Sequence, residues 1–228
     1  FVDNIVDPFP IPSNWLRIFG FDKGWSDATC LCCGALDPNT GICYIYDEYY
    51  ESQKAITFHA RRIKEMVDGV RMYKGIQADP SVRNRNDRDG VSYQQYFYQV
   101  SGIWLDEGNN DIQDGIDRVR DFMYLGKLKF FTSCINLKEE AGKYVWKTDK
   151  DGIQSDDPVD RNNHLMDALR YLCMGLPLDF KECYNTYKPE LILNKDTLIN
   201  RLKPDTDISD LLSDGEGGAY GIGMYNLN

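Results

Sequence analysis

The order of short apolar segments along the chain is the feature that most restricts its fold. Three of them, at 16–22, 28–36 and 42–50, follow one another, and the turn-forming sequence 37–41 separates the last two. Farther along, segments with an apolar residue every three or four positions alternate with short β-type segments. Three consecutive strands followed by alternating helices and strands are typical of a mixed α/β sheet with helices on its faces. We therefore predict such a sheet, with an antiparallel hairpin around 37–41.

The remaining elements follow from the same periodicities. We predict helices at 56–67, 92–100, 112–123 and 160–175, strands at 75–79, 102–105 and 127–131, and a polar hairpin or flap at 143–152. The last helix has the clearest pattern, because Leu165, Leu169, Leu172 and Leu176 share one face.

The length of the chain supports one globular domain with short additions. Its 228 residues, 42% of them apolar, are enough for a substantial core. We place the domain at 15–178, after an extended, proline-containing linker at 1–14 and before an acidic, glycine-rich tail at 179–228 that we expect to be partly disordered. The apolar runs are far too short to span a bilayer, so we expect no membrane partner.

Charge and cysteine content argue against several classes of protein. The chain has 26 Lys and Arg residues against 36 Asp and Glu residues, so any contact with DNA would depend on local basic patches or bound cations. Seven cysteines, an odd number in a chain of this size, are not typical of a disulfide framework and fit a reducing, cytoplasmic setting. We expect Cys30, Cys32 and Cys33 to fill a buried strand, because no second pair of soft metal ligands lies at a suitable spacing.

Two acidic residues follow apolar strands directly. Asp22 ends the segment 16–22, and Asp79 ends the segment 75–79. If these strands are parallel neighbours, both carboxylates emerge at the carboxyl edge of the sheet, where open α/β sheets gather their active groups. The alternative is ordinary turn chemistry, since Asp stabilises loops well.

The helix at 160–175 adds polar groups on the face opposite its leucines. Asp160, His164, Asp167 and Tyr171 stand at i, i+4, i+7 and i+11. One interpretation is a solvated polar face. The other is a metal cluster shared with the strand-end acids, because crowded carboxylates need divalent cations to stay ionised. Oxygen ligands suit Mg²⁺ or Mn²⁺, and two such ions would activate a water and stabilise the leaving oxygen in phosphodiester cleavage.

Three segments in this order resemble one known family. FGFDKGWSD at 19–27, IQADPS at 76–81 and NHLMDALRY at 163–171 are similar to motifs of the nuclease domain in the large terminase subunit of tailed bacteriophages. The resemblance implies an RNase H-like fold, a mixed sheet with three antiparallel strands first and parallel strands after them, flanked by helices. It also implies a metal-dependent endonuclease that cleaves double-stranded viral DNA concatemers during genome packaging. Such an enzyme uses two divalent cations, Mg²⁺ or Mn²⁺, and has little sequence specificity.

The resemblance also assigns roles to single residues. Asp22, Asp79 and Asp167 match the catalytic acids that bind the metals. His164 matches a position near the metal in some members, and Asp160 and Glu48 are further candidates for metal ligands. For Glu48, a solvated position on an aromatic strand is an equal alternative.

Basic residues near these motifs are the candidates for DNA contacts. They are Lys23, Arg83, Arg85, Arg88, Lys127, Lys129, Lys143 and Lys147. In the family a packaging ATPase precedes the nuclease, and this sequence contains no G-x-x-x-x-G-K-[ST] loop. The resemblance therefore implies a chain without ATPase activity. It would work with the ATPase domain of the same polypeptide, the portal protein and the small terminase subunit, in the cytoplasm of the infected bacterial host.

Two other functions remain open from the sequence. A catalytically silent docking module would bind the portal or the small terminase subunit through its acidic surface, and loss of a strand-end Asp would favour it. A resolvase or transposase-type nuclease would share the RNase H-like fold, but would need a denser basic surface than this chain has.

Overall fold

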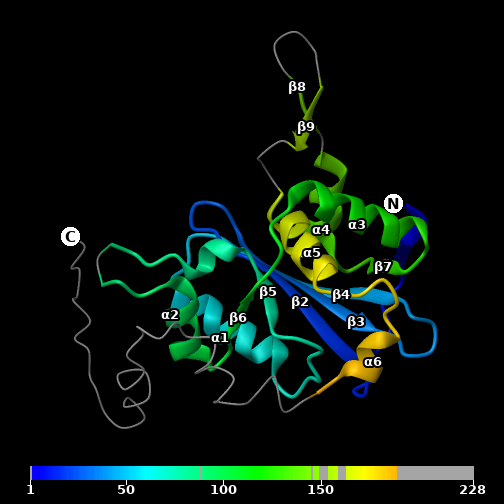
Figure 1. Ribbon diagram of the computed structural model, residues 1–228, viewed down its shortest axis with the longest axis horizontal. Coiled ribbons are helices and arrows are strands. Elements are labelled where there is room, and N and C mark those ends of the chain that lie inside the picture. Colours follow the sequence, from blue (N-terminus) through cyan, green and yellow to red (C-terminus); the bar gives the residue numbers. More distant parts are fainter. Residues whose placement is uncertain (1, 88, 145, 149–153, 159–162, 189–228) are drawn as a thin grey trace. The chain divides into compact units, whose positions relative to one another are not determined.

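Figure 1 shows the computed structural model, in which residues 2–87, 89–144, 146–148, 154–158 and 163–188 are described. The main sheet contains β1 (Ile5–Val6), β2 (Leu16–Asp22), β3 (Thr29–Leu36), β4 (Cys43–Glu51), β5 (Ile76–Ala78), β6 (Leu105–Glu107) and β7 (Leu128–Phe131). A separate hairpin consists of β8 (Trp146–Thr148) and β9 (Gln154–Pro158). The helices are α1 (Ile56–Val67), α2 (Tyr93–Ser101), α3 (Ile112–Tyr124), α4 (Ile135–Lys143), α5 (His164–Met174) and α6 (Glu182–Thr186), with 3-10 helices η1 (Val2–Asn4) and η2 (Pro80–Arg83).

The sheet has the strand order β1-β7-β4-β3-β2-β5-β6. β2, β3 and β4 pair antiparallel, β5 and β6 continue parallel to β2, and β7 and β1 continue parallel to β4. In this sheet, all strands except β3 therefore run in one direction, and their carboxyl ends lie at one edge. This arrangement confirms the predicted mixed sheet, including the hairpin of β3 and β4.

Helices cover both faces of the sheet (Figure 1). α1 and α2 pack on one face, where their apolar residues join Phe19 and Phe21 of β2. α3, α4 and α5 pack on the other face with Leu16 and Ile18 of the same strand. Side chains alternate between the faces of a strand. Asp22, four residues after Ile18, therefore lies on the face that α5 covers.

Gly20 allows α5 to lie directly on β2. A Cβ atom at this position would be 1.8 Å from the backbone oxygen of Ala168. Any larger residue would push the helix away from the sheet. The close approach of the two backbones brings the amino-terminal turn of α5 to the carboxyl edge of β2.

Several elements differ from the predictions. α4 forms where no helix is predicted, because Glu48 on the distant strand β4 accepts hydrogen bonds from its first N–H groups. The strand predicted at 102–105 lies at 105–107, since Gly102 ends α2 in the left-handed region with a φ of 73°. Within the predicted linker 1–14, β1 pairs with β7 and extends the sheet.

The folded region also continues past residue 178, where we place the start of the tail. Phe180 and Cys183 are buried, and the Tyr184 hydroxyl donates to the Leu36 carbonyl and accepts from the Leu16 N–H. The rest of the predicted tail, 189–228, lies outside the described residues.

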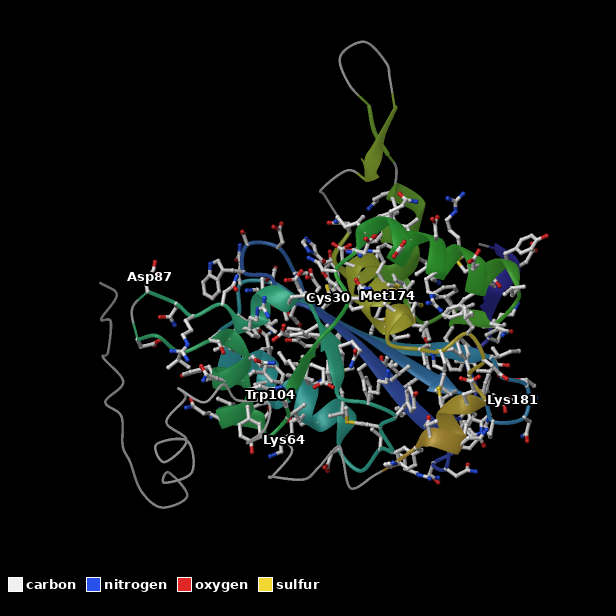
Figure 2. The ribbon with its side chains drawn as sticks, in the orientation of Figure 1. Cys30, Lys64, Asp87, Trp104, Met174 and Lys181 are labelled. Carbon is white, nitrogen blue, oxygen red and sulfur yellow. The ribbon has the colours of Figure 1, made fainter. Side chains whose placement is uncertain are left out.

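The cysteines pack as the sequence predicts. All seven are free and buried, and those in β3, including Cys30 in Figure 2, belong to a strand that is buried along its whole length. Of the helices described, none has the length and apolar content needed to cross a membrane.

Candidate active site

The strand-end acids stand side by side, because β2 and β5 are parallel neighbours. Gly20 pairs with Gln77 and Phe21 with Ala78, so Asp22 and Asp79 are the next residues in register. Asp167 comes from the first turns of α5, which packs on both strands. The charges of Asp79 and Asp167 both act on Asp22. Three acids far apart in sequence thus meet at the carboxyl edge of the sheet.

Helix α5 supplies a hydrogen-bond partner to each of the two strand acids. Nδ1 of His164 lies 3.0 Å from Oδ2 of Asp22 and donates to it. The Tyr171 hydroxyl donates to Oδ2 of Asp79 at 2.7 Å. The other oxygen of Asp79 accepts from the backbone N–H of Ser81 at 2.6 Å, as the cap of η2.

The same helix also fixes its own acid. Arg170 donates from Nε and Nη2 to Oδ1 of Asp167, at 3.1 and 2.9 Å. The Asn163 side-chain amide donates to Oδ2 at 3.0 Å. The guanidinium is buried, so this ion pair is a stable part of the site rather than a surface contact. Sequence reasoning placed Tyr171 on the polar face but missed the contribution of Arg170.

Burial and neighbouring charges set different pKa values in this cluster. Burial raises the pKa of Asp22 to about 6; the hydrogen bond from His164 opposes this rise, and the charges of Asp167 and Asp79 add to it. Burial also acts on Asp79, but hydrogen bonds from Ser81 and Tyr171 outweigh it and its pKa is lowered. The hydrogen bond to Asp22 raises the pKa of His164. Asp22 therefore gains more than Asp79 from a nearby cation.

The chemistry of this cluster suits a hard divalent cation. Carboxylate oxygens dominate, and the imidazole is the other donor type. In the described part of the chain, however, no three His, Cys, Asp or Glu side chains stand at metal-holding distances. The acids instead face their partners on α5. Asp22, Asp79 and Asp167 would hold the cation after moving closer together, each keeping its partner on α5 and binding the metal through a lone pair that remains free, with His164 next to them. The predicted ligand Asp160 lies outside the described residues.

Glu48, a candidate metal ligand from the sequence with a solvated position as its equal alternative, contacts helix α4 and not the three acids. Its Oε1 accepts from the backbone and side-chain N–H groups of Asn136, and its Oε2 accepts from the backbone N–H of Leu137. Both oxygens are thus used at the amino terminus of α4, where a negative charge is favoured. The sequence shows an acid at a strand end but cannot show which helix begins beside it.

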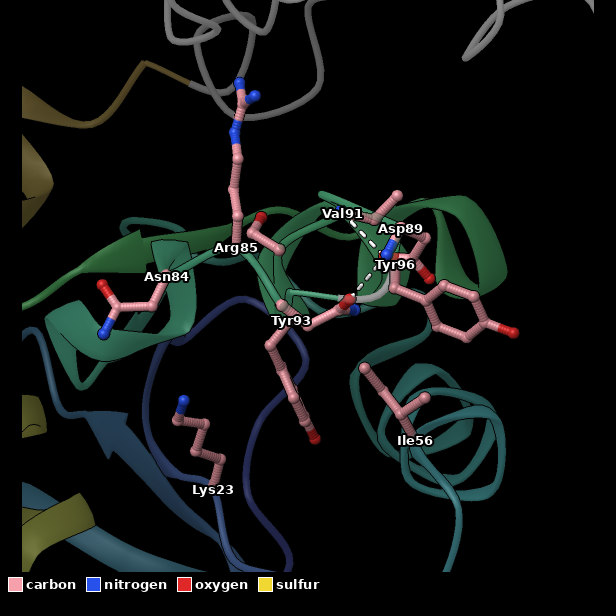
Figure 3. A pocket seen from close by; sticks show the side chains of 10 residues that line it. Lys23, Ile56, Asn84, Arg85, Asp89, Val91, Tyr93 and Tyr96 are labelled. Carbon is pink, nitrogen blue, oxygen red and sulfur yellow. Dashed lines mark hydrogen bonds between the residues drawn. The ribbon is translucent and has the colours of Figure 1, made fainter.

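A groove of about 580 Å³ lies between the segment after β2 and helix α2 (Figure 3). Lys23, which follows Asp22, lines it together with Tyr93 and Tyr96 of α2. Nζ of Lys23 donates to the Ser81 carbonyl at 3.1 Å and lies 5.8 Å from the centre of the Tyr93 ring. Arg85 is at the rim, and its side chain points away from Lys23 in Figure 3. Of the predicted DNA contacts among the described residues, Lys23 and Arg85 are thus the two that line this groove.

The other predicted DNA contacts are spread over the molecule. Arg83 is exposed and paired with Glu107 at 2.8 Å. Lys127 precedes β7 at the edge opposite the acids and donates to the Leu178 carbonyl, and Lys129 donates to the backbone carbonyl of Asp3. The structure therefore does not bring these two lysines to the acids. Three further residues complete the set: Lys143 is the last residue of α4 and pairs with Glu139, Lys147 is in β8, and Arg88 lies outside the described residues.

A comparison with known families identifies this arrangement. The family described as the terminase RNase H-like domain matches residues 19–173, a range that includes all three acids. The chain belongs to this family. Its resemblance to the terminase nuclease domain and its predicted RNase H-like fold are thereby confirmed.

Individual relatives agree with this assignment. The chain is 23% identical over 157 residues to the terminase large subunit of Escherichia phage T5, covering 68% of this chain and 34% of the relative. The large terminase nuclease domain of P22 has a similar fold, with a TM-score of 0.58 and 22% identity over 75% of this chain and 86% of that domain. So has the large terminase nuclease domain of bacteriophage SPP1 with bound Mn, with a TM-score of 0.56 and 18% identity over 75% of this chain and 95% of that domain. The chain thus spans about a third of the curated relative.

Proposed function

We propose that this chain is a metal-dependent endonuclease that cuts double-stranded viral DNA during genome packaging. The observation that carries the proposal is the meeting of Asp22, Asp79 and Asp167 at one edge of an RNase H-like sheet. The Mn bound to the SPP1 nuclease domain supports the use of a divalent cation. The basic side chains of Lys23 and Arg85 in the groove support contacts to DNA phosphates, which fix a backbone without reading bases.

Each residue of the site has a distinct task in this mechanism. Two divalent cations, Mg²⁺ or Mn²⁺, when bound, supply activation of the attacking water and stabilisation of the leaving oxygen. Asp22, Asp79 and Asp167 hold the cations. His164 and Tyr171 orient the two strand acids through the hydrogen bonds that they donate.

Two further groups prepare the substrate and the third acid. Arg170 fixes Asp167 by its paired hydrogen bonds. Lys23 contacts the phosphate next to the scissile one, since it directly follows Asp22 and its ammonium group faces the groove.

The whole polypeptide and its assembly belong to the same proposal. The chain covers 34% of the T5 large subunit, which leaves room for an ATPase domain on the same polypeptide. We assign the portal protein and the small terminase subunit as partners in packaging, and the cytoplasm of the infected bacterium as the location.

Cleavage of plasmid DNA tests the proposal. The purified chain should nick and linearise plasmid with Mn²⁺ or Mg²⁺ and leave it intact with EDTA. Asp79→Asn and Asp167→Asn should each abolish cutting without unfolding the protein, because an amide keeps the shape of the side chain and removes its charge. His164→Ala should reduce cutting less than either Asn variant, since a neutral imidazole adds no negative charge to the cluster.

Asp117→Asn is the matched control, because this exposed Asp on α3 pairs only with Arg120, at 3.8 Å, among the described ion pairs. It should cut like the parent. Cutting in EDTA, a single discrete cut site or a folded and active Asp79→Asn protein would contradict the proposal. A folded parent that never cuts would favour the docking module.

A further inference from the structure

Glu140 on α4 is a buried carboxylate outside the acid cluster, and the mechanism above does not use it. Its side chain is only 3% exposed. Oε2 accepts hydrogen bonds from the backbone N–H groups of Leu165 at 2.7 Å and Met166 at 3.2 Å. These groups belong to the first turn of α5, which packs against α4. Glu140 therefore caps α5 from a neighbouring helix.

The local sequence of α5 does not provide this cap. Asn163 occupies the N-cap position, but its side chain makes no capping hydrogen bond. It donates to Asp167 instead. The first N–H groups of a helix lack partners within the helix, and buried ones need an acceptor. Because Asn163 serves the acid, the helix depends on Glu140.

A carboxylate is a costly choice for a purely structural cap. Burial of a charge is unfavourable, and two charge-assisted hydrogen bonds and the positive end of the helix dipole offset only part of it. Moreover, Oε1 is buried and makes no hydrogen bond of normal geometry with the described residues, although the Tyr50 hydroxyl interacts with the carboxylate. A buried carboxylate at this place is explained if the cap serves to fix the position of the first turn of α5, and not only to stabilise the fold.

That turn carries two of the groups that form the candidate site. His164, the first residue of α5, contacts Asp22, and Asp167 is in the same turn. Farther along, α5 is held on the sheet by its contact with Gly20, whereas at the sheet edge Glu140 binds the backbone of the first turn. We propose that Glu140 is a positioning residue that sets where the first turn of α5 places His164 and Asp167. The proposal rests on the proposed function.

Mn²⁺ binding by the purified chain, measured by calorimetry well below the melting temperature, tests this role. Glu140→Ala should weaken Mn²⁺ binding about tenfold or more, the size typical of lost partners of metal ligands. Glu140→Gln should fall between Ala and the parent, about threefold weaker or more, because a neutral oxygen accepts weaker hydrogen bonds than a carboxylate. Glu139→Ala is the control: it removes an exposed acid from the same helix and should bind like the parent.

The outcomes separate the two proposals. A purely structural cap would lower the melting temperature and leave Mn²⁺ binding unchanged, so a folded Ala or Gln variant with binding within twofold of the parent overturns the positioning role. If the Ala variant does not fold, the Gln variant decides by the same criterion. A parent that binds Mn²⁺ but does not cut plasmid contradicts the proposed function and leaves the binding test of Glu140 valid. A parent that binds no Mn²⁺ overturns both.

Discussion

Asp22→Asn should stabilise the metal-free protein at neutral pH. In the folded protein the pKa of Asp22 is about 6, against an ordinary value of 3.8, chiefly because the group is buried. This difference corresponds to about 3 kcal/mol of unfavourable free energy for the ionised group. Asn has the shape of the protonated acid and no charge, so the variant avoids this cost.

The sign of the effect with pH follows from proton linkage. A folded-state pKa above the unfolded value means that the folded protein binds the proton more tightly. The destabilisation of the parent is therefore absent below about pH 4 and grows as the pH rises to above about 6. At pH 7.5 the variant should be more stable by about 3 kcal/mol, roughly 6–12 °C in melting temperature for a domain of this size. At pH 4 the two proteins should melt together.

Urea and thermal denaturation of parent and variant in EDTA, at half-unit steps from pH 4 to pH 8, measure this difference. Effects of titrating groups that do not interact with Asp22 cancel between the two proteins; His164, whose pKa the hydrogen bond to Asp22 raises, is the exception. Saturating Mn²⁺ should make the parent more stable than the variant, because only the parent has all three acids to bind the ion. A difference between parent and variant that is equal at pH 4 and pH 7.5, or a variant that is less stable in EDTA, would refute the reasoning.

Three further changes test the framework of the site. Gly20→Ala should destabilise the protein by about 3 kcal/mol or more in urea denaturation, since its Cβ would meet the Ala168 carbonyl at 1.8 Å; an unchanged midpoint would contradict the close packing of α5. Tyr171→Phe should keep the fold and weaken Mn²⁺ binding roughly tenfold by calorimetry, because Asp79 loses a hydrogen bond; equal affinity would show that the hydroxyl is dispensable. Truncation after residue 178 should lower the melting temperature by ten degrees or more, while truncation after residue 188 should not, because α6 packs in the core; equal melting would show α6 to be peripheral.

The parts of the fold that the sequence predicts are those with a strong local pattern. The apolar runs of β2 and β3, the turn at 37–41 and the leucine face of α5 each carry their own signal. These features do not depend on distant partners, so a pattern of residues is enough to find them. The meeting of Asp22 and Asp79 does depend on one, because it requires β2 and β5 to be parallel neighbours.

The missed parts depend on contacts between distant segments. α4 has little apolar periodicity, its buried residues include a glutamate, and its cap comes from Glu48, some ninety positions earlier. The same holds for Glu140, whose partners lie on α5. An acid that caps a distant helix has the same sequence signature as a solvated acid. Only the three-dimensional packing distinguishes them.

The separation of the site residues along the chain has a consequence for protein synthesis. His164 and Asp22 are 142 positions apart, and α5 supplies the contacts that hold every acid in place. A growing chain makes the sheet strands long before it makes this helix. The last component of the candidate site therefore leaves the ribosome near the end of the domain, and an incomplete chain cannot assemble the three acids with their partners.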